Sequence, residues 1–237
     1  MKRVSKFLVL VLVVALVFSV TGCDKKKKDN KKALEFKKEY EKLNGKTARY
    51  GKPHRTLNIP KDNPMVKITP AEVLEKIEKK ETFYLYVGDP LCPWCRSVIE
   101  TAIKTAKDND VKELYYIDFW DDENNEILRD VYEYKDGQVV KTVEETKEYK
   151  KMLELCKDSL GLRNYTIEDD KGNEIEVNTK RFFGPTFLFI KEGKFEKYTD
   201  GRSEKQKSPI EELSDEVLED MEENFNVFFL NICDDAC

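Results

Sequence analysis

Two cysteines separated by two residues, Cys92-Pro93-Trp94-Cys95, are the residues of this sequence best suited to chemistry. This spacing suits thiol–disulfide exchange, in which one thiolate attacks a disulfide and a second thiol resolves the mixed disulfide. A free cysteine, with a pKa near ~8.5, is mostly protonated at neutral pH, so the site must favour the thiolate. The N-terminus of a helix does this through its unpaired backbone N–H groups and the positive end of its dipole.

The surrounding residues place the pair at such a helix start. Thr82–Val87 is rich in aromatic and β-branched residues and predicts a buried strand, which Gly88-Asp89-Pro90 ends. After the pair, apolar residues recur at helical spacing, namely Val98, Ile99, Ala102, Ile103 and Ala106. We therefore predict that Cys92 is the exposed, attacking thiol and that Cys95 resolves. Pro93 suits a first helical turn, because N–H groups are unpaired there anyway, and Trp94 is expected to cover Cys95.

A CxxC pair alone is also compatible with a structural disulfide or with half of a zinc site. A four-ligand zinc site needs two further clustered ligands. The remaining candidates are scattered along the chain: Cys156, Cys233, Cys237 and the single histidine, His54. A lone histidine is more often a surface residue than a ligand or a base. We therefore expect no metal, no other cofactor and no functional role for His54.

Other segments predict an α/β pattern of helices and strands. A helix is expected from Thr69, where Thr69-Pro70-Ala71-Glu72 forms a capping pattern. Further helices are expected at Thr142–Leu160, with Thr142 and Glu145 as its cap, and from Ser208-Pro209-Ile210-Glu211. Strands are expected at Leu114–Phe119, at Thr186–Ile190, at Lys194–Tyr198, and as a hairpin of Tyr165–Ile167 with Ile175–Val177.

The segment Phe183-Gly184-Pro185-Thr186 opens one of these apolar strands. Together with Tyr84–Val87 before the cysteine motif, it resembles the thioredoxin superfamily over about residues 66–225. The resemblance implies a thioredoxin-like mixed sheet flanked by helices. It also implies that Gly184, Pro185 and Thr186 bind substrate, with Pro185 as a cis-proline beside the cysteines and Gly184 pairing with the substrate backbone.

The sequence departs from a minimal thioredoxin in two places. Eighty-nine residues separate Cys95 from Pro185, which predicts a helix-plus-hairpin insertion at about residues 121–178. The buried acid that thioredoxins carry on the strand before the motif would fall near Tyr86, where no acid is present. The Pro-Trp dipeptide resembles glutaredoxins more than reducing thioredoxins. Small membrane-attached thioredoxin-like proteins of Gram-positive bacteria, including bacteriocin-transport accessory proteins, have a similar tyrosine-rich strand before their CPxC motif.

The N-terminus is typical of a secreted lipoprotein. Basic residues precede the apolar stretch Phe7–Val20, whose fourteen residues suit a signal peptide better than a membrane span. Val20-Thr21-Gly22-Cys23 resembles a bacterial lipobox, which implies a signal peptide at residues 1–22 and a lipid on Cys23. Such a lipid would hold the protein on the extracytoplasmic face of the cell membrane.

The remaining chain divides into three predicted parts. Residues 23–65 are a tether and polar lead-in, in which Asp24–Lys38 holds eight lysines and is expected to be solvated and attracted to anionic lipid. Residues 66–230 form the thioredoxin-like domain, and residues 231–237 are a cysteine-containing tail. Removal of residues 1–22 changes the formal net charge from −5 to −8, which disfavours nucleic-acid binding.

Three more cysteines remain outside the motif. Cys156 lies on the apolar stripe of its expected helix, so burial is its default environment. Cys233 and Cys237 lie in the tail, and a structural disulfide among these three cysteines is expected in an oxidising compartment. A relay of electrons between the tail pair and the CPWC motif is a weaker alternative.

These features predict a membrane-anchored, extracytoplasmic thiol–disulfide oxidoreductase that acts on protein cysteines and is recycled by an unidentified redox partner. An oxidase, an isomerase-like helper and a membrane-fed reductase are all compatible with the motif, because the location favours persistent disulfides. The alternative is a non-catalytic binding or accessory module in which Cys92 and Cys95 form a static disulfide.

Overall fold

A computed structural model describes residues 31–48, 51–121, 125–156 and 161–230. At its centre is a mixed five-stranded sheet in the order β1-β3-β2-β8-β9. The strands are β1 (Met65–Lys67), β2 (Phe83–Gly88), β3 (Leu114–Asp118), β8 (Thr186–Lys191) and β9 (Lys194–Thr199). The first three are parallel, and β8 is antiparallel to both β2 and β9. The predicted α/β class and mixed sheet are confirmed, whereas β1 was not predicted.

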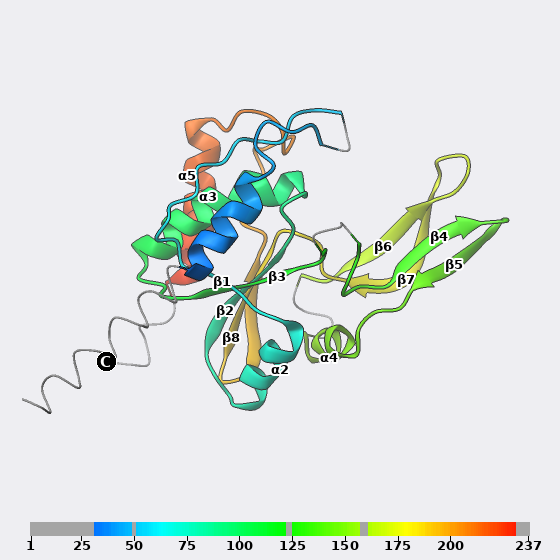
Figure 1. The fold of residues 1–237 in the computed structure, drawn as a ribbon, viewed down its shortest axis with the longest axis horizontal. Helices are drawn as coiled ribbons and strands as arrows, with labels where there is room; N and C mark the ends of the chain where they lie inside the picture. The colour runs from blue at the N-terminus through cyan, green and yellow to red at the C-terminus, as the bar shows by residue number, and fades with distance from the viewer. Residues whose placement is uncertain (1–30, 49–50, 122–124, 157–160, 231–237) are drawn as a thin grey trace, which may run out of the picture.

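Helices cover both faces of this sheet (Figure 1). One face carries α3 (Pro93–Asp108), α5 (Asp215–Phe229) and the helical residues 31–41. The other face carries α2 (Pro70–Glu78) and α4 (Lys147–Cys156).

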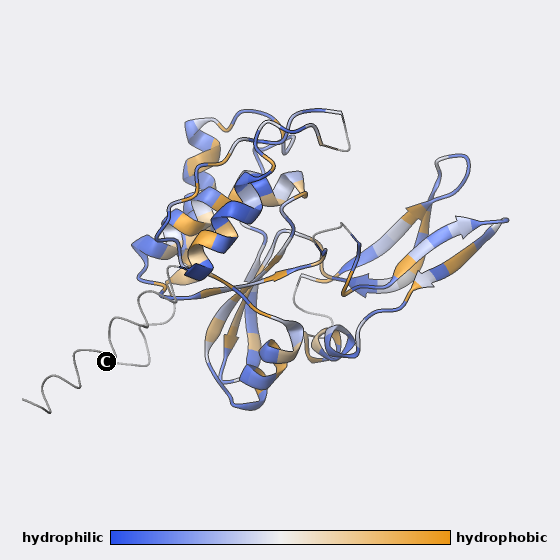
Figure 2. Cartoon of the chain, in the orientation of Figure 1, coloured by the Kyte–Doolittle hydropathy of each residue, from blue (hydrophilic) through white to orange (hydrophobic). Residues whose placement is uncertain are grey.

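Apolar residues gather where these helices meet the sheet and form two separate layers (Figure 2). The central strand β2 serves both layers, because successive side chains of a strand point to opposite faces. Tyr84 and Tyr86 pack in the layer of α3 and α5, whereas Phe83, Leu85 and Val87 pack in the layer of α2 and α4. The motif helix α3 is therefore anchored on a strand that is buried on both sides.

Two hairpins lie outside the central sheet, between β3 and β8 in the chain. One pairs β4 (Val131–Lys135) with β5 (Gln138–Val143), and the other pairs β6 (Arg163–Glu168) with β7 (Glu174–Arg181). Both project to the side of the sheet (Figure 1). The second hairpin confirms the turn predicted between residues 167 and 175.

The expected helix at Thr142–Leu160 is wrong at its start. Thr142 lies in β5, where its hydroxyl contacts the carbonyl of Val131 across the hairpin, and α4 begins only at Lys147. The reason is the turn Asp136-Gly137, in which both residues have positive φ, 51° and 79°. Such Asp-Gly turns match the twist of paired strands, and strand pairing here overrides the local capping pattern. Residues 157–160 are outside the described part of the chain.

The two other predicted caps differ in outcome. At Thr69 the capping box forms as predicted, since the hydroxyl accepts from the amide of Glu72 and the Glu72 carboxylate accepts from the amide of Thr69. At Ser208 the Glu211 carboxylate also accepts the backbone amide, but the chain only turns there. The helix begins at Asp215 with Ser214 as its N-cap, so the predicted start at Ser208 is wrong.

The solvated tether predicted for Asp24–Lys38 is wrong from residue 31 onward. Residues 31–41 are helical, and Ala33, Phe36 and Tyr40 are buried against the sheet. These apolar positions recur three and four residues apart, which places them on one face of a helix despite the neighbouring lysines. His54, expected at the surface, is also buried, with 5% of its surface exposed.

Several predictions fall on residues that the structure does not describe. The signal peptide, the lipidation site Cys23, and the tail cysteines Cys233 and Cys237 lie in residues 1–30 and 231–237. Within the described ranges, no helix combines the length and the apolar composition needed to cross a membrane.

Candidate active site

Cys92 occupies the N-cap position of α3, directly after the loop that follows β2. Its backbone is extended, with φ −70° and ψ 119°, and its sulfur accepts a hydrogen bond from the amide of Cys95 at 3.4 Å. The loop is fixed by Asp89, whose carboxylate accepts from the amide of Leu91 and whose carbonyl accepts from the amide of Cys92. The sulfur of Cys92 therefore lies at the positive end of a helix of sixteen residues.

The two cysteines differ in their access to solvent. Cys92 is partly exposed, whereas Cys95 is fully buried, one helical turn inside α3. Pro93 and Trp94, both partly exposed, form the first turn between them. Both cysteines are thiols in this structure. Only Cys92 is accessible to a partner molecule, as expected for an attacking thiol with a resolving thiol behind it.

The electrostatic environment separates the two thiols in the same direction. The hydrogen bond from the Cys95 thiol lowers the pKa of Cys92, with help from the amides of Cys95 and Trp94 and against burial and the charge of Asp89. Burial raises the pKa of Cys95 well above its ordinary value, and the neighbouring Cys92 raises it further. The arrangement favours a thiolate at Cys92 and a protonated thiol at Cys95, which is the state needed to begin disulfide exchange.

The loop before β8 closes the site from the side opposite α3. The peptide bond between Gly184 and Pro185 is cis, as the resemblance implied. The Gly184 carbonyl accepts a hydrogen bond from the thiol of Cys92 at 3.4 Å. A side chain at Gly184 would have its Cβ only 2.5 Å from the sulfur of Cys95, so the loop approaches this closely because residue 184 is glycine. Thr186 donates its hydroxyl to the carbonyl of Phe183 and stabilises the loop itself.

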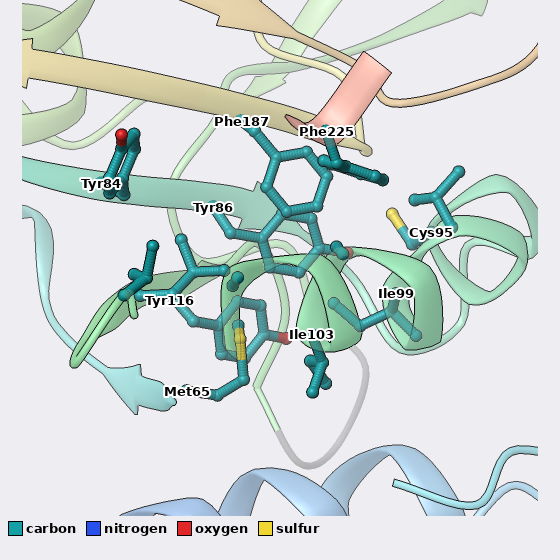
Figure 3. Packing of buried hydrophobic residues seen from close by; sticks show 14 of the residues in the cluster. Met65, Tyr84, Tyr86, Cys95, Ile99, Ile103, Tyr116, Phe187 and Phe225 are labelled. Atoms are coloured by element: carbon teal, nitrogen blue, oxygen red, sulfur yellow. The ribbon is translucent and has the colours of Figure 1, made fainter. Parts of the chain in front are cut away.

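Two tyrosines outside the CPWC motif lie on the side of the buried sulfur. Tyr86 on β2, the position without an acid, directs its side chain toward Cys95 (Figure 3). Its hydroxyl also lies 2.9 Å from that of Tyr40, which comes from the helical residues 31–41. Figure 3 shows Tyr86 within the core beside Cys95 and α3. The continuous aromatic and apolar run of β2 predicts that Tyr86 is buried, but no sequence signal pairs it with Tyr40.

A buried arginine ties the N-terminal segment to the motif helix. Arg96, next to Cys95, is 1% exposed. Its guanidinium donates to the carbonyls of Tyr40 and Pro90, at 2.9 and 3.3 Å, and to the carbonyl of Arg55. It also donates to the side-chain oxygen of Asn44 at 2.9 Å. Tyr40, Asn44 and Arg55 are thus held to the motif loop by one side chain.

A buried carboxylate ends β3 near the site. Asp118 lies near the side chain of Glu39, and its carboxylate lies 3.7 Å from the ammonium of Lys67. Burial, together with the charge of Glu39, raises the pKa of Asp118 to about 8. This carboxyl group therefore stays protonated over much of the physiological pH range.

An open cleft of about 610 Å³ adjoins the motif at Trp94. Its walls come from the segment after β9 and from α5, and they carry charges of both signs, including Asp200, Arg202, Lys205 and Asp220. The guanidinium of Arg202 lies 4.9 Å from the centre of the Trp94 ring. The cleft is large enough for several side chains of an extended peptide.

The other predicted site residues are not brought to the motif. Cys156 is buried at the end of α4, in the apolar layer on the opposite face of the sheet, as its helical stripe predicted. Its predicted disulfide partners, Cys233 and Cys237, are outside the described residues. Within the described ranges, no three side chains of His, Cys, Asp or Glu cluster closely enough to hold a metal ion.

No protein-family model matches the chain, and no curated protein matches it either.

Proposed function

We propose that this protein is a thiol–disulfide oxidoreductase of the thioredoxin superfamily that acts on protein cysteines through Cys92 and Cys95. The observation that carries the proposal is the asymmetry of the pair at the start of α3, with a partly exposed Cys92 and a buried Cys95 behind it. A static structural disulfide would not need a sulfur that is accessible and favoured as a thiolate.

Three features of the fold support the family assignment. The sheet order β1-β3-β2-β8-β9 places the motif directly after its central strand. Pro185 follows a cis peptide bond directly before β8, beside the cysteines. The strands β4 to β7 and helix α4 lie outside that sheet, which supports an insertion at about residues 121–178.

The chemistry follows from the two thiols. The Cys92 thiolate attacks a substrate disulfide, R–S–S–R′, forms Cys92–S–S–R, and releases R′–S⁻, which takes a proton from solvent. The Cys95 thiol then loses its proton, and its thiolate attacks the sulfur of Cys92. This step forms the Cys92–Cys95 disulfide and releases R–SH, so that two electrons have passed to the substrate. The same steps in reverse oxidise a substrate dithiol, and a dithiol or disulfide partner protein restores the site.

Turnover on a model substrate tests this proposal. The wild-type protein should accelerate the reduction of insulin by dithiothreitol or the oxidation of a reduced test protein. The Cys92→Ser variant should abolish this activity, whereas Cys156→Ser, which removes a buried thiol on the other face of the sheet, should retain it. Absence of both activities in the wild-type protein would contradict the proposal and favour a binding or accessory module.

We further propose that Cys23 carries a lipid and holds the protein on the outer face of the cell membrane. The support is the sequence Val20-Thr21-Gly22-Cys23 after an apolar stretch. Expression of the full chain in a bacterium supplied with an alkyne analogue of palmitate should label the wild type and not Cys23→Ala. Equal labelling of both would exclude this anchor.

A further inference from the structure

The hydroxyl of Tyr86 is directed at the sulfur of the resolving cysteine. Tyr86 is fully buried on β2, and its hydroxyl is near enough to Cys95 to lower the pKa of that thiol, against the larger effect of burial. Figure 3 shows the ring of Tyr86 in the core close to Cys95. The hydroxyl of Tyr86 thus lies next to a reacting atom of the proposed exchange.

The ring of Tyr86 is held rigidly from both sides. It stacks on Tyr116 with centroids 5.4 Å apart and an interplanar angle of 20°, and on Phe187 at 4.5 Å and 19°. Stacked neighbours on both faces prevent the ring from moving out of position without repacking the core. The O–H bond of Tyr86 keeps its rotation about the C–O axis, and this rotation decides which neighbour receives the proton.

A second hydroxyl extends the chain away from the sulfur. The oxygen of Tyr40 lies 2.9 Å from that of Tyr86, and either can be the donor. Tyr40 is itself held in place, because its carbonyl accepts from Arg96, the residue after Cys95, at 2.9 Å. The helix at residues 31–41 therefore places the hydroxyl of Tyr40 on the interior side of the site.

We propose that Tyr86 is a catalytic residue that donates its hydroxyl proton in a hydrogen bond to the Cys95 thiolate during resolution, and that Tyr40 positions and supports it by donating to Tyr86 in turn. This inference rests on the proposed oxidoreductase function.

Each hydroxyl has one proton and can also accept, so this chain can reverse its direction. While Cys95 is a thiol, its S–H donates to Cys92, and Tyr86 can donate to Tyr40. When Cys95 becomes a thiolate, both tyrosines donate toward the sulfur. In the overall step, Cys95–SH and Cys92–S–S–R give the Cys92–Cys95 disulfide and R–SH. The proton of Cys95 ends on the departing substrate thiol, and both tyrosines keep theirs and exchange no electrons.

The groups around Cys95 create a need for such a donor. Burial and the neighbouring Cys92 and Asp89 all disfavour a charged sulfur, whereas the hydroxyl of Tyr86 acts in the opposite direction and lowers the pKa of Cys95. Tyr40 and Tyr116 lie next to Tyr86, and the charges of Asp118 and Asp89 add to the effect of burial in raising the pKa of Tyr40. Burial raises the pKa of Tyr40 and Tyr86 well above 10, so both remain protonated donors at neutral pH.

Tyrosine-to-phenylalanine variants of the full chain test the inference, because they keep the stacked rings and remove only hydroxyls. The matched control is Tyr116→Phe, since Tyr116 is equally buried in the same stack and its hydroxyl has no hydrogen-bond partner among the described residues. In a Cys92→Ala background, alkylation of Cys95 is followed against pH by peptide mass spectrometry. Resolution of the mixed disulfide is timed separately, with Cys92 present.

Tyr86→Phe should move the pH midpoint of Cys95 alkylation upward by about one unit, which means about tenfold less thiolate and about tenfold slower resolution at neutral pH. Tyr40→Phe should move the midpoint in the same direction by less, and Tyr116→Phe should leave it unchanged. Equal midpoints for Tyr86→Phe and Tyr116→Phe would overturn the inference. If Tyr86→Phe does not fold, an unchanged midpoint in Tyr40→Phe would overturn the supporting role of Tyr40.

The two proposals fail separately. Wild-type protein that resolves mixed disulfides, together with an unshifted Tyr86→Phe variant, contradicts only the role of Tyr86. Wild-type protein that forms no mixed disulfide contradicts the oxidoreductase function itself.

Discussion

Replacing Arg96 by methionine should lower the free energy of unfolding by about 3–5 kcal/mol. The guanidinium is 1% exposed and donates to three backbone carbonyls, those of Tyr40, Arg55 and Pro90, and to Asn44. Methionine fills part of the same volume but donates nothing. A buried acceptor that loses its partner costs about 1–3 kcal/mol, so three carbonyls at the lower end already give ~3 kcal/mol.

Urea unfolding followed by circular dichroism measures this loss, with comparison at the midpoint and slope of each curve. Arg163→Met is the matched control, because Arg163 is 46% exposed and pairs with Asp200 at the surface, where such pairs contribute about 0–1 kcal/mol. Arg96→Lys should lie between the two, since an ammonium cannot reach all four acceptors together. A loss below ~1 kcal/mol for Arg96→Met would refute the view that this side chain holds residues 40–55 to the motif helix.

Three further predictions concern the site directly. Because the pKa of Cys92 is lowered, the rate of its alkylation by iodoacetamide should fall on acidification with a midpoint below ~8.5, the pKa of a free cysteine. A midpoint at or above that value would contradict the site geometry. Gly184→Ala places a Cβ 2.5 Å from the sulfur of Cys95 and 3.2 Å from the Cα of Gly88. This variant should lower the free energy of unfolding, measured in urea, by about 1–3 kcal/mol and should slow disulfide exchange. An unchanged exchange rate would argue against close contact of this loop with the cysteines. In the folded state the pKa of Asp118 is raised to about 8, so the folded protein binds this proton more tightly than the unfolded chain does. The protonated carboxyl therefore contributes stability that is fully present below about pH 4 and is lost as the pH rises through 8. Asp118→Asn should flatten that decline in urea titrations, and an unaltered pH dependence would count against the buried, protonated carboxyl.

Local periodicity was sufficient to predict most of the central sheet and the motif helix. β2, β3 and β8 are largely apolar runs, β9 follows β8 across the Glu192-Gly193 turn, and α3 carries apolar residues at helical spacing. Both signals come from neighbouring residues and survive folding, because the segments are buried in the way that their patterns require.

Two incorrect predictions, the solvated tether and the helix start at Thr142, have different physical causes. The helix at residues 31–41 has a readable apolar face at Ala33, Phe36 and Tyr40, but the lysine-rich composition hid it. The end of β5, Thr142 and Val143, falls in the predicted helix because the capping pattern at Thr142 is local, whereas the Asp136-Gly137 turn pairs this segment with β4.

The contact between Tyr40 and Tyr86 was beyond sequence reasoning altogether. The two hydroxyls are 46 positions apart in the chain and meet only when the N-terminal helix packs on the sheet. The buried Arg96 is similar, since a charged residue in a surface-type position of a helix carries no local signal that it will be covered by residues 40–55. Such polar contacts within the core depend on tertiary packing rather than on local pattern.

The reduction potential of the Cys92–Cys95 pair tests the central claim most directly. Equilibration of the purified protein against glutathione or dithiothreitol buffers, with the disulfide fraction read by mass spectrometry, gives this value. An accessible, thiolate-favoured Cys92 predicts a reversible couple between about −270 and −120 mV, the range of catalytic dithiols. A potential below about −300 mV would identify a structural disulfide and contradict the account.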